Sequence, residues 1–371
     1  MLKRTIPLGR ILGIPLGLDP SWFLIFALIT WSLAASYYPA EFKNWPSIEY
    51  WLVGAITAVI FFASVVLHEL GHSVVALRYK IPVRSITLFI FGGVAQITGE
   101  PPSAAAEFWM AIAGPFVSFA LALAFTALQG AFSSLAPLLA VSKYLAYINA
   151  TLGAFNLIPG FPLDGGRVFR AALWAITKKP QRATTIAATV GRGFGFLFIL
   201  VGVWQVFTGN LGGLWIAFIG WFLEGAARTQ LQQQSLQNLL KGHRVIEATQ
   251  RGYATVQEDA TLDYLVKAHL LGSGRRCLMV TRDDETVGLL TIQNVKDVPR
   301  AEWPTTTVAA AMMPIAQVEK ADPDEELWSA LQEMEQGAIE QLPVMEDGRC
   351  LGVLGREDVV DFLRTHRELA A

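Results

Sequence analysis

Long apolar runs are the feature that most constrains the fold of this chain of 371 residues. They lie almost entirely before residue 228, and each has the length of roughly 20 residues that crosses the hydrocarbon core of a bilayer. Backbone amides in lipid need hydrogen-bond partners within the protein, so such runs fold as helices. The sequence therefore predicts a multipass α-helical membrane protein with about six transmembrane helices, near residues 20–38, 50–74, 106–128, 136–158, 190–207 and 212–228.

The basic residues between these runs predict how the chain crosses the membrane. Lysines and arginines gather before the first run, after the second, and between the fourth and the fifth, whereas the opposite loops offer little beyond Lys43. Loops rich in Lys and Arg remain in the cytoplasm. We therefore expect a protein of the cytoplasmic cell membrane with both termini in the cytoplasm.

The composition changes after the last apolar run, which divides the chain into domains. We expect a transmembrane domain over 1–228 and a polar helical linker over 229–244. The remainder is charged, with ordinary alternation of apolar and polar positions, and is predicted to form two soluble α+β domains over 245–305 and 306–368.

An internal repeat supports these two soluble domains. Residues 277–295 align without gaps on residues 341–359, and each copy reads strand, turn, strand and helix. An amphipathic helix is expected before each copy, at about 261–271 and 325–336. The repeat predicts two similar modules side by side in the chain.

Charge and cysteine usage exclude two classes of function. The formal net charge is −2, and no basic stripe with interleaved aromatic residues is present, so a nucleic-acid partner is not expected. Cys277 and Cys350 are too few for a disulfide framework or a thiolate metal site. We expect both to act as small buried hydrophobic residues.

A metal-binding motif lies near the end of the second apolar run. It is His68-Glu69-Leu70-Gly71-His72, and it follows a stretch without a charge from Trp51 to Leu67. Two histidines four residues apart share one face of a helix and can bind zinc, and the glutamate between them can act on water. Ionisable residues inside a membrane span are usually functional because their burial in lipid costs roughly 2.5–3.5 kcal/mol. The motif predicts a zinc site within or at the edge of the membrane.

Two histidines leave a zinc ion in need of a third protein ligand. The carboxylates expected on the same side of the membrane are Glu100, Glu107, Asp164 and Glu224. Asp164 is the best placed, because it follows a Pro- and Gly-rich segment that cannot be a regular helix, and irregular backbone at membrane depth is tolerated where it lines a cavity. A helix-terminating loop is the alternative interpretation of that segment.

At this point the sequence resembles the site-2 protease family of intramembrane zinc metalloproteases, peptidase family M50. The matching residues are H-E-L-G-H at 68–72 and N-L-I-P-G-F-P-L-D-G-G-R at 156–167. Ala113-Gly114-Pro115 and Phe91-Gly92-Gly93-Val94 also resemble family elements, the second of which belongs in relatives to a membrane-associated hairpin near the active site. The resemblance covers roughly residues 1–228.

The resemblance and the local chemistry imply the same roles. His68, His72 and Asp164 would hold one Zn²⁺ per chain, and Glu69 would be the catalytic general base. Asn156 would contact the substrate backbone or the oxyanion, with a helix–helix hydrogen bond as the alternative.

A helical substrate must be unwound before its peptide bonds can be attacked. Residues 82–102 alternate in polarity and are predicted to offer a strand edge to an extended substrate, with an ordinary surface hairpin as the alternative. A loop-like element is expected at residues 6–15, before the first span.

The C-terminal repeat resembles a tandem pair of CBS domains. Such pairs commonly bind adenine nucleotides through a Ser/Thr-x-x-Asp at the end of the second strand, but this chain has Thr291-Ile-Gln-Asn294 in one copy and Gly355-Arg-Glu-Asp358 in the other. Neither copy is complete. The resemblance thus leaves two roles open, an adenine-nucleotide sensor that uses Thr291, Asn294 and Asp358, and a structural module that forms a homodimer.

Together these features predict an intramembrane zinc metalloprotease that cuts transmembrane substrates in or near the bilayer, with its CBS pair as a candidate regulator. The alternative is a CBS-regulated membrane transporter or channel. That function would explain the spans and the repeat but would leave the H-E-L-G-H and Leu-Asp-Gly motifs without a role. A catalytically silent relative that only binds membrane partners is a third interpretation, and the complete ligand set argues against it.

Overall fold

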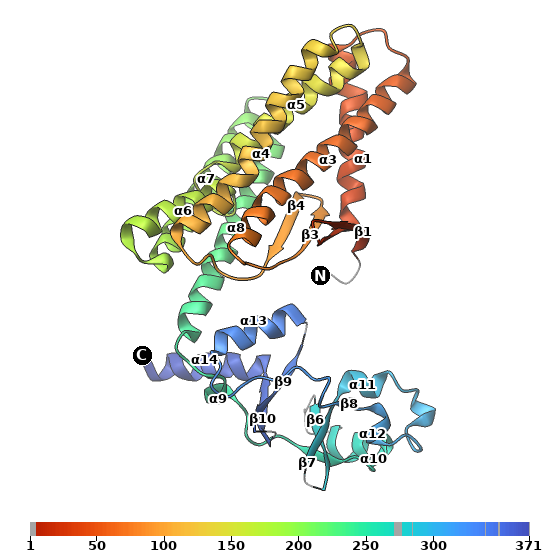
Figure 1. Cartoon of the computed structure of the whole chain (residues 1–371), viewed down its shortest axis with the longest axis vertical. Helices are drawn as coiled ribbons and strands as arrows, with labels where there is room; N and C mark the ends of the chain where they lie inside the picture. Colours follow the sequence, from red (N-terminus) through yellow and green to blue (C-terminus); the bar gives the residue numbers. More distant parts are fainter. Residues whose placement is uncertain (1–4, 271–276, 284, 338, 348, 371) are drawn as a thin grey trace. The chain divides into compact units, whose positions relative to one another are not determined.

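The structure is a computed structural model that describes residues 5–270, 277–283, 285–337, 339–347 and 349–370 (Figure 1). The chain divides into two compact units, Met1–Gln234 and Ser235–Ala371. The first unit contains the apolar runs, and the second contains the repeat.

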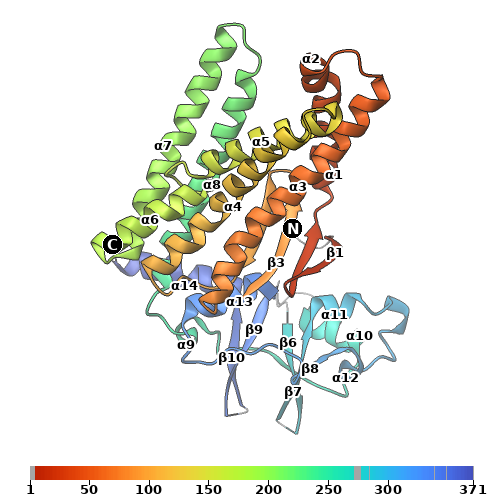
Figure 2. The ribbon, with the colours of Figure 1, turned by 45° about the horizontal axis from the view of Figure 1, so that its top comes forward.

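Long helices make up most of the first unit. They are α1 (Ser21–Ser32), α2 (Tyr38–Glu41), α3 (Ser47–Arg78), α4 (Ala104–Ala131), α5 (Ala136–Asn156), α6 (Asp164–Thr177), α7 (Pro180–Phe207) and α8 (Gly213–Leu240), with a π-helical turn at Leu33–Tyr37 that joins α1 to α2. Helix α4 packs against both α3 and α6 (Figure 2).

Five helices of the described chain are long and apolar enough to cross a membrane. They are Ser21–Glu41, Ser47–Arg78, Ala104–Ala131, Ala136–Asn156 and Pro180–Phe207. The fifth begins ten residues before the expected start at 190, because Pro180 opens a helix that continues without a break. The sixth expected span, 212–228, lies in α8 and is not among the five. Its apolar part is short, since Glu224, Arg228 and the glutamines after them lower the hydropathy of the helix.

A four-stranded sheet belongs to the same unit. Its strands are β1 (Ile6–Ile11), β2 (Ile14–Leu18), β3 (Val83–Phe89) and β4 (Gly92–Ile97), in the order β1-β2-β3-β4. The expectation of a loop at residues 6–15 was wrong, because β1 and β2 form an antiparallel hairpin whose second strand pairs in parallel with β3. Leu12 and Gly13 both have positive φ, as the tight turn between the strands requires.

Apolar side chains fix this sheet against the helices. Ile14, Leu18 and Ile86 from the sheet are buried with Phe62 and Leu70 of α3. This packing places strand β4 beside the part of α3 that carries the H-E-L-G-H motif (Figure 1). The hairpin expected at 82–102 is thus present as β3 and β4, with β4 at the edge of the described sheet.

The second unit shows the expected repeat. Its helical elements are α9 (Val245–Ala248), α10 (Leu262–Leu265), a π-helical turn at Val266–Leu270, α11 (Ile292–Lys296), a 3-10 turn at Arg300–Glu302, α12 (Val308–Ala311), α13 (Leu327–Gly337) and α14 (Arg356–Ala370). Its strands are β5 (Thr255–Gln257), β6 (Cys277–Arg282), β7 (Glu285–Thr291), β8 (Met313–Pro314), β9 (Gln341–Glu346) and β10 (Arg349–Gly355).

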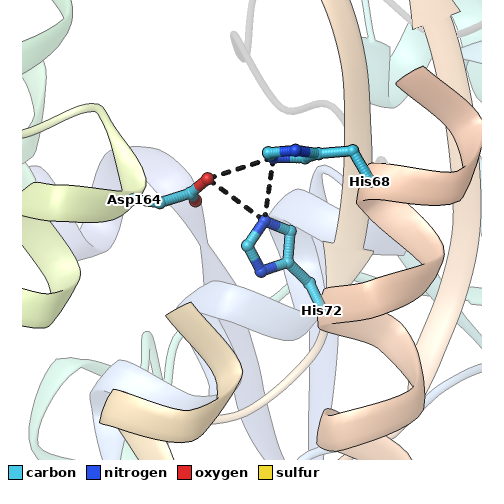
Figure 3. Close-up of side chains that lie close together, drawn as sticks. All are labelled: His68, His72 and Asp164. Carbon is cyan, nitrogen blue, oxygen red and sulfur yellow. Dashed lines mark hydrogen bonds and ion pairs between the residues drawn. The ribbon is translucent and has the colours of Figure 1, made fainter. Parts of the chain in front are cut away.

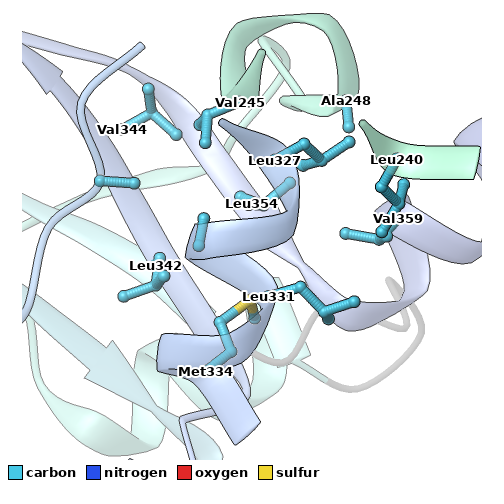
Figure 4. Packing of buried hydrophobic residues seen from close by; sticks show 12 residues of the cluster. Leu240, Val245, Ala248, Leu327, Leu331, Met334, Leu342, Val344, Leu354 and Val359 are labelled. Carbon is cyan, nitrogen blue, oxygen red and sulfur yellow. The ribbon is translucent and has the colours of Figure 1, made fainter. Parts of the chain in front are cut away.

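The succession of strand, turn, strand and helix is confirmed in both copies, as β6-β7-α11 and β9-β10-α14. The helix expected at 325–336 is α13. The one expected at 261–271 is shorter, since α10 gives way to the π-helical turn, and residue 271 lies outside the described residues. The core of the second copy is formed by apolar residues from its helices and strands, such as Leu327 of α13, Leu342 of β9 and Leu354 of β10 (Figure 4).

Candidate metal centre

Three side chains of the first unit meet at one point (Figure 3). His68 and His72 lie one turn apart on α3, and Asp164 is the first residue of α6. The Asp164 Oδ2 atom lies 3.1 Å from His68 Nε2 and 3.2 Å from His72 Nε2, and the two Nε2 atoms are 3.3 Å apart. Both histidines are buried.

These separations fit a tetrahedral metal site. Zinc binds histidine nitrogen and carboxylate oxygen at about 2.0–2.2 Å, which places two neighbouring tetrahedral ligand atoms about 3.3 Å apart. The three observed separations are close to that value. Two imidazoles and one carboxylate are also the donor set of catalytic zinc sites that leave a fourth position open.

The outer nitrogens of both imidazoles are held by α4. His72 Nδ1 donates to the backbone oxygen of Met110 at 2.6 Å, which leaves Nε2 as the acceptor that a metal requires. His68 Nδ1 is 2.8 Å from the hydroxyl of Ser118. Gly114 lies between these contacts, where a Cβ atom would meet the Nε2 atoms of both rings. Sequence reasoning missed Met110 and Ser118, since a backbone oxygen and a single serine in an apolar helix give no distinctive pattern.

Glycines in the segment before α6 bring Asp164 to this point. A Cβ atom at Gly165 would meet the backbone of Leu157 and Ile158, and one at Gly166 would meet Gly160. The expected close backbone approach in this segment is therefore confirmed. Burial acts to raise the pKa of Asp164, but the two imidazoles outweigh it and hold that pKa below its usual range.

The other candidate carboxylates lie elsewhere. Glu107 pairs with Arg170 at 2.6 Å and Glu224 with Arg192 at 3.0 Å, while Glu100 is exposed. Among the residues that the structure describes, only His68, His72 and Asp164 form a group of this kind.

A cavity of about 690 Å³ opens onto the three ligands. Glu69, Asn156 and Arg167 also line it, and most of the remaining wall is apolar and comes from α1, α5, α8 and the β3–β4 hairpin. The Glu69 carboxylate accepts a hydrogen bond from the backbone nitrogen of Ala95 on β4 at 3.2 Å. The site thus places a carboxylate, a candidate metal triad and a strand edge around one apolar cavity.

The second unit has a separate cleft of about 480 Å³, which Asp358 lines together with Tyr253 and Cys277. Thr291 and Asn294 are not among the residues that line it, and they cap α11 through reciprocal hydrogen bonds. Of the three residues expected to bind a nucleotide, Asp358 therefore lines this cleft and the other two do not.

Comparison with known proteins agrees with these features. Residues 56–140 and 129–200 match peptidase family M50, and residues 308–365 match the CBS domain. Rip3 of Mycobacterium tuberculosis is 36% identical over 99% of this chain and 94% of its own length, and sll0528 of Synechocystis is 33% identical over 98% and 97%. Both carry names that describe them as zinc metalloproteases.

A solved structure is similar as well. The site-2 protease from Methanocaldococcus jannaschii aligns with 28% identity over 62% of this chain and 95% of its own, with a TM-score of 0.44. The sequence left two functions open, a protease and a transporter or channel. The relatives that match nearly the whole chain favour the protease. The chain belongs to peptidase family M50, the site-2 proteases, and is an intramembrane zinc metalloprotease with a C-terminal CBS pair.

Proposed function

We propose that His68, His72 and Asp164 hold one Zn²⁺ per chain and that Glu69 is the catalytic base. The observation that carries this assignment is the convergence of three ligand atoms within 3.3 Å of one another, with the Glu69 carboxylate in the same cavity. Zinc, when bound, supplies Lewis-acid chemistry at the scissile carbonyl. Glu69 takes the proton of the attacking water and passes it to the leaving amine.

The Glu69→Gln variant tests this assignment, because the amide keeps the size of the side chain but cannot accept the proton. We expect one zinc per chain and no cleavage of a transmembrane substrate in liposomes. Glu224→Gln is the matched control, since Glu224 is ion-paired with Arg192 and does not line the cavity. Cleavage by Glu69→Gln at the rate of the control would refute the role of Glu69, and full zinc content in Asp164→Asn would refute the ligand set.

Asn156 is proposed to contact the substrate. It is the last residue of α5 and lines the cavity with Glu69 and Asp164, so its amide can donate to a substrate carbonyl. Asn156→Ala should lower kcat and leave the zinc content unchanged. An unchanged kcat would remove this role.

We further propose that the substrate binds as an extended strand along β4. The β3–β4 hairpin has a two-residue turn, so the residues that flank it, Phe89 and Gly92, form a hydrogen-bonded pair. Hydrogen-bonded and non-hydrogen-bonded pairs alternate along an antiparallel ladder, which puts Gly93 and Ala95 in non-hydrogen-bonded pairs. Their backbone N–H and C=O groups therefore point away from β3. The hydrogen bond from Ala95 to Glu69 agrees with that direction. A substrate segment added at this edge would be extended, with its helix unwound, as it passes the proposed metal ligands. Hydrolysis requires that exposure of the peptide bond.

Proline at position 95 removes the outward amide, and with it the hydrogen bond to Glu69, while leaving the ladder with β3 in place. Ala95→Pro should therefore lose most cleavage and keep its zinc, whereas Ala95→Gly, which retains the amide, should cleave. Equal cleavage by the two variants would contradict strand addition at this edge.

The membrane placement is also a proposal. The basic loops support a cytoplasmic cell membrane with both termini inside, which puts the metal centre toward the cytoplasmic end of α3. Domain limits of 1–228, 245–305 and 306–368, with a linker at 229–244, follow from the same composition. A reporter fused to the C-terminus that is active only outside the cytoplasm should be silent. Activity of this reporter would show that the C-terminus lies outside the cytoplasm and would refute the proposed orientation.

For the CBS pair we propose adenine-nucleotide binding in the cleft that Asp358 lines. The carboxylate caps α14 by accepting from the backbone nitrogen of Gly355 at 2.7 Å while it faces the cleft. Thr291 and Asn294, which bond to each other, would take no part. Titration of the full-length protein with ATP, ADP and AMP should give heat that Asp358→Ala abolishes. No heat with any of the three would leave homodimer formation as the role of the pair, which cross-linking of the full-length protein would test.

A further inference from the structure

One face of helix α4 contacts both histidines of the proposed metal centre and the helix that carries Asp164. Glu107, Met110, Gly114 and Ser118 recur at spacings of three and four residues, which places them on the same side of a helix, and all four are buried. Met110 and Ser118 hold the outer nitrogens of the two imidazoles, and Gly114 leaves room for both rings. Helix α4 supplies none of the three ligands, yet it contacts both helices that do.

Glu107 is the member of this face that contacts α6. Its side chain is 0% exposed, and its Oε1 atom accepts from Arg170 Nη1 at 2.6 Å. The Arg170 Nε atom donates to the hydroxyl of Thr184 on α7 at 2.7 Å. A single guanidinium therefore ties α6 to α4 and α7 at once. Burying two charges is costly unless they meet in good geometry, and apolar residues of similar volume often serve stability as well as a buried ion pair does.

The position of Arg170 on α6 suggests what the pair does. Asp164 begins the helix and Arg170 follows six residues later, about 9 Å along the axis at 1.5 Å per residue. Rotation of α6 about its axis would swing the Asp164 carboxylate away from the imidazoles. A fixed arginine about 1.7 turns further along opposes that rotation.

We propose that the Glu107–Arg170 ion pair positions Asp164 for metal binding, so that α4 aligns all three ligands. Glu107 and Arg170 are positioning residues that act through α6. This inference rests on the proposed role of Asp164 as a ligand. Contacts that orient a metal ligand typically contribute 10- to 100-fold to metal affinity, so loss of the pair should weaken zinc binding by about that factor.

The test replaces both charges at once, because a single change would leave one buried charge alone. Glu107→Leu with Arg170→Met keeps the volume and is expected to fold, as apolar replacements of buried ion pairs often do. The full-length protein is titrated with Zn²⁺ against a chelator, and with Co²⁺ to record the ligand-field spectrum. We expect affinity about 10- to 100-fold weaker than in the wild type and an altered Co²⁺ spectrum.

A second ion pair of the same unit gives the matched control. Arg192 and Glu224 join α7 to α8 at 3.0 Å, and among the described residues neither forms an ion pair with α6, so Glu224→Leu with Arg192→Met should keep the wild-type affinity and spectrum. Wild-type zinc affinity and Co²⁺ spectrum in the Glu107/Arg170 double variant would overturn the proposal.

Two more variants separate the possible failures. Asp164→Asn tests the ligand itself, so zinc binding retained by this variant refutes the ligand set. Loss of zinc binding in Asp164→Asn together with full binding in the Glu107/Arg170 double variant refutes the positioning role alone. Should the double variant not fold, Arg170→Lys keeps the charge but cannot reach both Glu107 and Thr184 with one planar group. It should then weaken zinc binding, and wild-type affinity would overturn the proposal.

Discussion

Substitution of Gly114 by alanine is the sharpest test of how the metal centre is packed. An added Cβ atom would lie 2.6 Å from His68 Nε2, about 0.8 Å inside the 3.4 Å at which ordinary contacts begin, and closer still to His72 Nε2. The Cβ atom is fixed to the helix backbone, so the imidazoles must move or α3 and α4 must separate. Ligand distances at a zinc site tolerate deviations of about 0.2 Å. A displacement several times larger prevents both rings from binding one ion.

We therefore expect Gly114→Ala to weaken zinc binding by at least about 100-fold, which corresponds to about 2.7 kcal/mol. The measurement is competition of the purified apoprotein with a fluorescent chelator, together with thermal unfolding in the absence of metal. Gly130→Ala is the matched control, because it changes the same residue type in the same helix at a position with nothing within 4 Å. Zinc affinity in Gly114→Ala equal to that of Gly130→Ala would refute the reasoning. Such a result would mean that α3 and α4 separate to accommodate the added methyl group while the imidazoles keep their positions.

Three further predictions concern single contacts. Ser118→Ala removes the hydroxyl beside His68 Nδ1 and should weaken zinc binding about tenfold, and unchanged affinity would show that the ring is held without it. Tyr38→Phe breaks a buried bond of 2.6 Å to Thr57 and should lower the free energy of unfolding by about 0.6 kcal/mol with no change in zinc affinity, as measured by denaturation and chelator competition. Desolvation of the half-buried Cys277 thiol raises its pKa to about 12, so iodoacetamide at pH 8 should alkylate it slowly in the folded protein and quickly after denaturation, whereas fast labelling of the folded protein would contradict the raised pKa.

The three residues that could hold a metal could be predicted because they are encoded in two ways that survive without a structure. His68 and His72 share a helix face through local geometry alone. Asp164 required two further inferences, that the spans alternate across the membrane and that a Pro- and Gly-rich segment cannot be a regular helix. The structure brings all three together, so this reasoning identified the residues that can hold a metal.

Pairing between distant segments could not be predicted in the same way. The prolines and glycines of the β1–β2 hairpin obscure the alternation of a strand and favour a loop, yet β2 pairs with residues of β3 that lie seventy positions later in the chain. The end of the membrane domain posed a different difficulty. An apolar stretch of α8 grades into glutamine-rich helix without a turn, so the helix continues past residue 228, where composition placed the end of the sixth span.

Three close approaches through glycine explain how a polar site keeps its shape in a membrane protein. Helices in lipid gain no hydrophobic driving force from meeting each other, so their association depends on close packing of small residues. A Cβ atom at Gly71 would lie 2.9 Å from the Ala113 oxygen of α4, one at Gly93 of β4 would lie 2.8 Å from the Glu69 side chain, and one at Gly114 would enter the imidazoles. Helix α4 and strand β4 therefore approach the H-E-L-G-H motif closely at positions occupied by glycine. That arrangement holds the proposed ligands, the proposed base and the strand edge in register, and it predicts that small additions of volume here will cost metal binding before they cost folding.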